Sequence, residues 1–211
     1  MSVPIGAWLS MFSAFLLMFI GILRYKYLPQ EIRLLLLFFI IVVANESFTT
    51  YMTFKEKNTY WIFHIYTLIE YSLLILVLSY WQKNKVLRQS LLWSILFYGM
   101  IWLVAKISIE KVTHFDNITA AISHIILVGV ATYTFYTMSK ENFRNLFRDP
   151  RFWISSGIII YYTGNLLWLI FGNVMLSWPL TYLTIAWYLH WSINILANVF
   201  YAGGFLCQIH R

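Results

Sequence analysis

The amino-acid sequence predicts an all-α membrane protein in which residues 1–211 form one bundle of seven transmembrane helices. Hydrophobic residues make up 61% of the chain and charged residues only 11%, whereas a water-soluble domain has roughly 45–50% and about 25%. Aromatic residues make up 20% of the chain, which also indicates a membrane protein. Seven apolar segments each have about the 20 residues that a helix needs to cross a hydrocarbon core of roughly 30 Å.

The first 23 residues of the chain contain no charge, so the first predicted span lacks the basic start of a secretion signal and should remain in the mature protein. The next four spans are separated by short segments that contain Lys or Arg. The stretch 152–209 has no Asp, Glu, Lys or Arg and is too long for one helix, and Gly172-Asn173 with Trp178-Pro179 supply a turn within it. The predicted spans are Ile5–Leu23, Leu34–Met52, Tyr60–Trp81, Ser90–Ala105, Ile118–Met138, Phe152–Gly172 and Leu180–Leu206.

Basic residues are distributed unequally between the two sets of loops, and this predicts the orientation. One set, after the first, third and fifth spans and at the C-terminus, holds Arg24, Lys26, Arg33, Lys83, Lys85, Arg88, Lys140, Arg144, Arg148, Arg151 and Arg211. The other set holds Lys55, Lys57, Lys106 and Lys111. Because cytoplasmic loops are enriched in Lys and Arg, we expect the N-terminus outside and the C-terminus in the cytoplasm.

The net charge of +7 does not indicate a nucleic-acid partner, because the basic residues form short clusters between apolar blocks. The partners expected are the lipid bilayer and a cytoplasmic or membrane protein that contacts the basic inner loops. The longest of these loops, Ser139–Arg151, has aromatic and basic residues at helical spacing and is predicted to lie as a short helix on the inner leaflet. The single cysteine, Cys207, excludes an internal disulfide.

Five ionisable residues fall inside predicted spans, where each costs a few kcal/mol and therefore suggests a functional site. They are Glu46, His64, Glu70, His124 and His190. At about 1.5 Å per residue, all five and Asn165 lie between the predicted outer surface and the midplane, with Glu70 and His190 deepest at about 15 Å. Their shared depth predicts a buried pair between Glu70 and His190.

Helical spacing predicts which polar side chains face the bundle interior. In the last span, Trp187, His190, Asn194, Asn198 and Tyr201 follow one stripe, and in the sixth span Ser155, Tyr162, Asn165 and Trp168 do the same. In the third span, Tyr66 lies one turn before Glu70. The residues predicted to line a polar pocket open to the outside are Glu46, His64, Tyr66, Glu70, His124, Tyr162, Asn165, Trp187, His190 and Asn194.

Three functions fit such a pocket. The first is a membrane receptor or sensor for a small molecule or lipid, since the pocket would be mostly aromatic with a few polar groups. The second is a small-solute transporter with three-plus-one-plus-three helices. Shifting the first half of the chain by 120 residues places Asn45 on Asn165 and Glu70 on His190.

The third function is a membrane-embedded hydrolase or oxidase that acts on lipid. Its zinc or iron would be bound by His64, His124 and His190, with Glu46 or Glu70 as the catalytic base. No HxxxH or HExxH pair occurs in any span, which makes an enzyme the less favoured class. Retinal is excluded as a cofactor, because the last span has no lysine for a Schiff base.

Three blocks of sequence resemble a group of small bacterial seven-helix proteins known as hypothetical integral membrane proteins. The blocks are His64–Tyr71, Phe152–Ile154 with Gly157 and Tyr161–Asn165, and His190–Tyr201. The resemblance implies a multi-pass protein of the bacterial inner membrane and carries over the topology only. It favours a sensory or accessory role over housekeeping catalysis.

Overall fold

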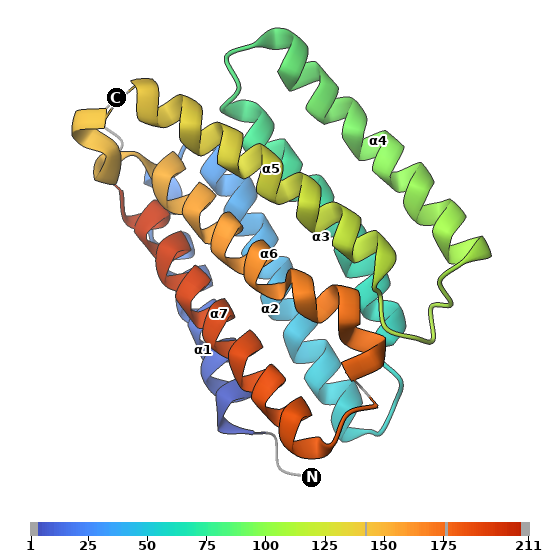
Figure 1. The fold of residues 1–211 in the computed structure, drawn as a ribbon. Helices are drawn as coiled ribbons and strands as arrows, with labels where there is room; N and C mark the ends of the chain where they lie inside the picture. The colour runs from blue at the N-terminus through green and yellow to red at the C-terminus, as the bar shows by residue number, and fades with distance from the viewer. Residues whose placement is uncertain (1–3, 142, 176, 208–211) are drawn as a thin grey trace.

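The structure is a computed structural model that describes residues 4–141, 143–175 and 177–207. These residues form seven α-helices, two short 3-10 helices and no β-strand (Figure 1), which confirms the all-α fold. In chain order the elements are α1 (Ile5–Leu23), η1 (Tyr25–Tyr27), α2 (Gln30–Phe54), α3 (Tyr60–Tyr80), α4 (Lys85–Ser108), α5 (Ile118–Glu141), η2 (Phe143–Arg148), α6 (Pro150–Met175) and α7 (Leu180–Leu206).

The predicted bounds of α1 and α7 are confirmed, and the end of α3 differs by one residue. The predicted bounds of α2, α4, α5 and α6 are too short, because these helices continue past the apolar segment into polar residues. Helix α4 shows the cause most clearly. The Asn84 side chain accepts hydrogen bonds from the N–H groups of Val86 and Leu87, which caps the helix before the predicted start at Ser90. In Ser139–Arg151, the short helix expected on the membrane surface is the 3-10 helix η2.

Six helices, α1 to α6, are long and apolar enough to cross a membrane. Helix α7 has 27 residues but carries the polar residues His190, Asn194 and Asn198 among its apolar ones. Its outward side chains, such as Ile185, Leu189 and Val199, are nevertheless apolar and exposed. Exposed apolar side chains also cover the outer faces of the other helices, as they do in a multi-pass membrane protein.

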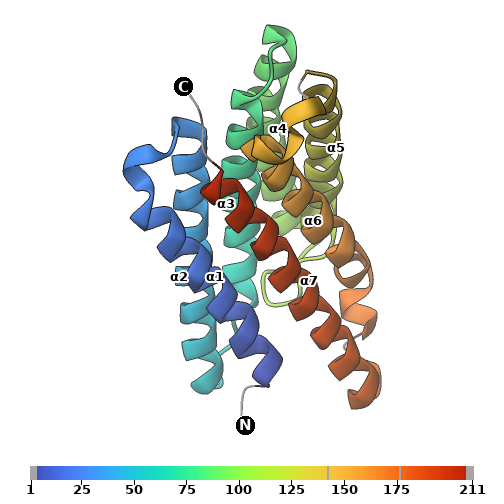
Figure 2. The same ribbon diagram turned by 90° about the vertical axis from the view of Figure 1, so that its left-hand side faces the viewer.

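Six helices form a closed ring in the order α1, α2, α3, α5, α6, α7, and α7 returns to pack against α1. Figure 2 shows α1 and α7 side by side. Helix α4 lies outside the ring against α3, at the edge of the molecule in Figure 1. The ring interior is filled by buried side chains such as Phe39, Tyr201 and Phe205, whose rings meet edge to face.

Two pairs of helices have the same spacing along the two halves of the chain. Helices α2 and α6 begin at residues 30 and 150, and helices α3 and α7 begin at residues 60 and 180, so 120 residues separate each pair. A 3-10 helix precedes α2 and another precedes α6. Helices α1–α3 contact helices α5–α7 where α3 meets α5 and where α7 meets α1. Helix α4 connects α3 to α5 from outside the ring.

The loops gather at two ends of the bundle. The end that we call the basic end contains the loops after α1, α3 and α5 together with the end of α7, and the Arg24 guanidinium there donates to the Leu206 carbonyl at 2.8 Å. The opposite end, called the distal end, contains the loops after α2, α4 and α6, and the Asn58 amide there donates to the Thr113 carbonyl at 3.2 Å. The beginning of α1 and the end of α7 therefore lie at opposite ends (Figure 1).

Candidate functional site

A buried carboxylate lies where the two halves of the ring meet. Glu70, halfway along α3, is 4% exposed, and its Oε1 accepts hydrogen bonds from two tyrosines. The Tyr162 hydroxyl of α6 donates at 2.8 Å and the Tyr66 hydroxyl, one turn earlier in α3, donates at 3.1 Å. We call these three residues the Glu70 cluster. When the carboxylate is ionised both hydrogen bonds are charge-assisted, and the one from Tyr162 connects α3 to α6.

Aromatic contacts extend from the Glu70 cluster toward α5 and α7. The His124 ring of α5 lies edge-on to the Tyr162 ring, with the ring centres 4.5 Å apart. Tyr161 lies between His124 and His190, with ring centres 6.4 Å and 6.5 Å away. His190 in turn pairs with Asn165 of α6, and 2.7 Å separates its Nδ1 from the amide oxygen. Two of the predicted site histidines, His124 and His190, therefore lie on either side of the Tyr161 ring.

The polar stripe of α7 faces the protein, as its spacing predicts. The amides of Asn194 and Asn198 donate to the hydroxyls of Ser10 and Ser13 in α1, at 2.7 Å and 2.8 Å. Trp187 packs against Trp168 of α6, with the ring centres 4.6 Å apart. These contacts hold α7 between its two neighbours, so the asparagines serve helix packing.

A group of charged side chains lies buried near the distal end, and we call it the ionic cluster. Its members are His64 of α3, Lys106 of α4, Glu110 and Asp116 of the α4–α5 loop, and Thr119 of α5. The Lys106 ammonium donates to Glu110 Oε2 at 2.7 Å, to Asp116 Oδ1 at 3.1 Å and to Thr119 Oγ1 at 2.6 Å. The side chains of His64, Lys106, Glu110 and Asp116 are at most 7% exposed.

Both carboxylates of the ionic cluster are ionised at neutral pH. Burial alone would raise the pKa of Asp116, but the neighbouring His64, Thr119 and Lys106 outweigh it and lower this pKa to about 2. For Glu110, burial is again opposed, here by hydrogen bonds from Lys106, from the Ile118 N–H and from Thr119, which lower the pKa below its ordinary value. The α4–α5 loop is therefore held to the helices by charge.

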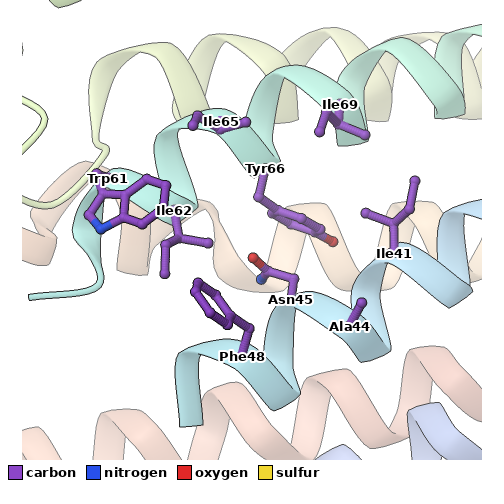
Figure 3. Close-up of a pocket in the computed structure, with 9 residues that line it drawn as sticks. All are labelled: Ile41, Ala44, Asn45, Phe48, Trp61, Ile62, Ile65, Tyr66 and Ile69. Carbon is purple, nitrogen blue, oxygen red and sulfur yellow. The ribbon is translucent and has the colours of Figure 1, made fainter. Parts of the chain in front are cut away.

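A groove of about 290 Å³ lies between α2 and α3, in the half of the bundle nearer the distal end. Figure 3 shows the Asn45 and Tyr66 side chains next to each other between the two helices. All other lining residues are apolar, and several are exposed on the outer face of the bundle, so the groove opens sideways. They are Ile41, Ala44, Phe48, Trp61, Ile62, Ile65 and Ile69.

Several predicted contacts are not formed. The single outward-open pocket is replaced by separate groups, because the ring interior is filled with side chains. Glu70 binds two tyrosines and His190 binds Asn165, and no hydrogen bond or ion pair joins Glu70 to His190 among the described residues. Glu46 joins neither group, since its buried Oε2 has no hydrogen-bond partner in the described part of the chain.

The structure does not bring together His64, His124 and His190, the histidines named as ligands for the case that a metal is present, because the three imidazoles belong to different groups. In the described residues, the one group of three or more side chains close enough to share a metal ion is His64, Glu110 and Asp116. Sequence reasoning treats Lys106 as a free loop charge and overlooks Glu110 and Asp116. The signal for Glu110 is its spacing of four residues from Lys106, which pairs opposite charges just past the end of α4.

Comparison of the chain with protein-family models, with curated proteins and with solved structures gave no match.

Proposed function

We propose that the protein is a membrane receptor or sensor whose ligand is a lipid or lipid-like molecule with one hydrogen-bonding group. The observation that carries this proposal is the position of Tyr66. Its side chain lines the groove between α2 and α3, and its hydroxyl donates to Glu70, which also accepts from Tyr162 of α6. A ligand that binds to Tyr66 would therefore alter a link between the two halves of the bundle.

The groove suits an apolar ligand. Seven of its nine lining residues are apolar, and its volume of about 290 Å³ is close to the lower limit of roughly 300 Å³ for small-molecule sites. It opens on the outer face of α2 and α3, where the bilayer lies in a membrane-spanning bundle, so a lipid can enter sideways. Asn45 and Tyr66 are the groups that would recognise the polar end of the ligand.

Such a receptor would have to pass its signal to another protein. We expect this partner protein to bind at the basic end. The loops after α1, α3 and α5 and the end of α7 gather there. By the positive-inside rule this end faces the cytoplasm and the groove lies in the outer half of the membrane. The proposed location is the bacterial inner membrane.

The binding site can be tested by photocrosslinking. The protein in nanodiscs is exposed to a diazirine-bearing palmitic acid, and labelled residues are mapped by mass spectrometry. We expect labels on residues 41–48 and 61–69, and Ala44→Trp, which fills the groove, should reduce them several-fold. Thr132→Trp is the matched control, because Thr132 is exposed on α5, outside the groove lining. Labels spread evenly over all exposed helices and unchanged by Ala44→Trp would contradict the proposal.

A transporter is the second candidate, and the repeat of helices α1–α3 and α5–α7 favours it. In transporters built from repeats, the substrate site lies near the midplane where the repeats meet, and Glu70 occupies such a position. Proteoliposomes separate the two candidates. A transporter should take up a labelled sugar or amino acid and lose this uptake in Glu70→Gln, whereas a receptor should show no uptake above empty vesicles.

A further inference from the structure

Two buried polar atoms of the ionic cluster face each other without a hydrogen bond. His64 Nδ1 and Asp116 Oδ2 are 3.4 Å apart, on side chains that are 1% and 4% exposed. Neither atom has a hydrogen-bond partner in the described part of the chain. A buried polar atom without a partner costs about 1–3 kcal/mol, more when it is charged, so this arrangement calls for a ligand.

The other ring nitrogen determines what His64 Nδ1 can do. His64 Nε2 lies 3.0 Å from the backbone carbonyl of His114, and a carbonyl only accepts, so Nε2 must carry the hydrogen. In a neutral imidazole, Nδ1 then has a lone pair directed toward the carboxylate of Asp116. Two acceptors at this distance repel each other unless a cation lies between them.

The Lys106 ammonium is not that cation. It donates to Glu110 Oε2, Asp116 Oδ1 and Thr119 Oγ1, which accounts for all three of its N–H bonds. Lys106 therefore holds the opposite oxygen of Asp116 and leaves Oδ2 directed at His64.

We propose that His64 Nδ1, Asp116 Oδ2 and the carboxylate of Glu110 form a binding site for a divalent transition-metal ion, with zinc as the best match. The three ligand atoms lie within 4.8 Å of one another. Zinc bonds of about 2.0–2.1 Å to nitrogen and oxygen at a tetrahedral angle place two ligands roughly 3.3–3.4 Å apart. The observed separation between His64 and Asp116 has this length.

The surroundings of His64 also have the form found at metal sites. A histidine that binds a metal usually donates its other ring N–H to a carbonyl or carboxylate, which orients the ring. His64 does so toward His114, and its own backbone carbonyl accepts from the Trp102 indole at 2.9 Å. The ion would join α3 to the α4–α5 loop, and this role does not depend on the proposed lipid site.

The test is zinc binding to the intact protein, purified in mild detergent with every affinity tag removed. Stoichiometry is measured by elemental analysis after dialysis, and affinity is measured by titration calorimetry. The variants are His64→Gln and Asp116→Asn, each checked by gel filtration. His124→Gln and His190→Gln are matched controls, because both replace buried histidines outside the ionic cluster.

We expect one zinc ion per chain in the wild type and in both controls. Loss of a ligand should weaken binding by more than the roughly 10–100-fold effect of losing an outer-shell contact. Lys106→Met, which removes a competing cation, should retain zinc or bind it more tightly. Cobalt(II) added in place of zinc should give the visible absorption of tetrahedral coordination in the wild type, so the proposal stays testable if one variant does not fold.

Three results would overturn the proposal. The first is wild-type protein that binds no zinc or cobalt. The second is zinc that persists at full stoichiometry in His64→Gln and Asp116→Asn. The third is zinc that is lost only in the His124 or His190 control.

Discussion

Tyr162→Phe removes one hydroxyl from the centre of the bundle and leaves the ring in place. The hydroxyl is 2.8 Å from Glu70 Oε1, and both residues are at most 4% exposed. Hydrogen bonds to charged groups contribute about 1.5–3 kcal/mol in soluble proteins, whereas side-chain hydrogen bonds in membrane proteins average about 0.6 and reach about 1.7 kcal/mol. We therefore expect Tyr162→Phe to lower the free energy of unfolding by about 1–2 kcal/mol.

Tyr66→Phe should lower the free energy of unfolding by less than Tyr162→Phe does. The hydrogen bond from Tyr66 to Glu70 is longer, at 3.1 Å, and Tyr66 is only half-buried. The double variant should lose more stability than the sum of the two single variants, since it leaves the buried Oε1 atom of Glu70 without either donor. Reversible unfolding by dodecyl sulfate in mixed micelles measures these values, with Tyr133→Phe as the control because Tyr133 is 44% exposed. A Tyr162→Phe variant as stable as Tyr133→Phe would refute the assignment of Glu70 as the link between α3 and α6.

Two further predictions concern helix packing and orientation. Gly129→Ala should stabilise the protein by about 0.5–1 kcal/mol, because a Cβ at this position in α5 meets nothing within 4 Å. Gly203→Ala should destabilise the protein by about 1–3 kcal/mol, because its Cβ would lie 2.6 Å from the Trp153 ring. Unfolding in mixed micelles should show changes of opposite sign in the free energy of unfolding of the two variants. A Gly203→Ala protein of wild-type stability would contradict this prediction. Burial raises the pKa of the Cys207 thiol, so less thiolate is present at neutral pH, and labelling by a membrane-impermeant maleimide should be slow there and accelerate as the pH rises. Labelling should occur in inside-out vesicles and not in intact cells, and the reverse result would invert the proposed orientation.

The helices could be predicted from the sequence because a membrane span needs a long apolar segment, and this pattern is local. Their ends were less predictable, because a cap such as Asn84 lies among polar residues that hydropathy assigns to a loop. A shift of 120 residues, which the sequence suggests from few identities such as Asn45 with Asn165, also separates the starts of α2 and α6 and of α3 and α7.

The contacts within the site could not be predicted, because they depend on the order of helices in the ring. Spacing within α3 places Tyr66 one turn before Glu70, and this contact is confirmed. The second donor, Tyr162, lies 92 residues away in the chain, and depth alone suggests His190 as the partner of Glu70. Depth is shared by many residues, whereas a hydrogen bond requires the two side chains to meet in space, here Glu70 of α3 and Tyr162 of α6.

The central claim, that a ligand in the groove is linked to the α3–α6 contact, is tested most directly by the affinity of Tyr162→Phe for a fluorescent fatty acid. Tyr162 is buried and does not line the groove. A coupling free energy of 1 kcal/mol or more corresponds to about a 5-fold change in affinity. We predict at least that change for Tyr162→Phe and none for Tyr133→Phe. Equal affinities for the wild type, Tyr162→Phe and Tyr66→Phe would contradict the claim.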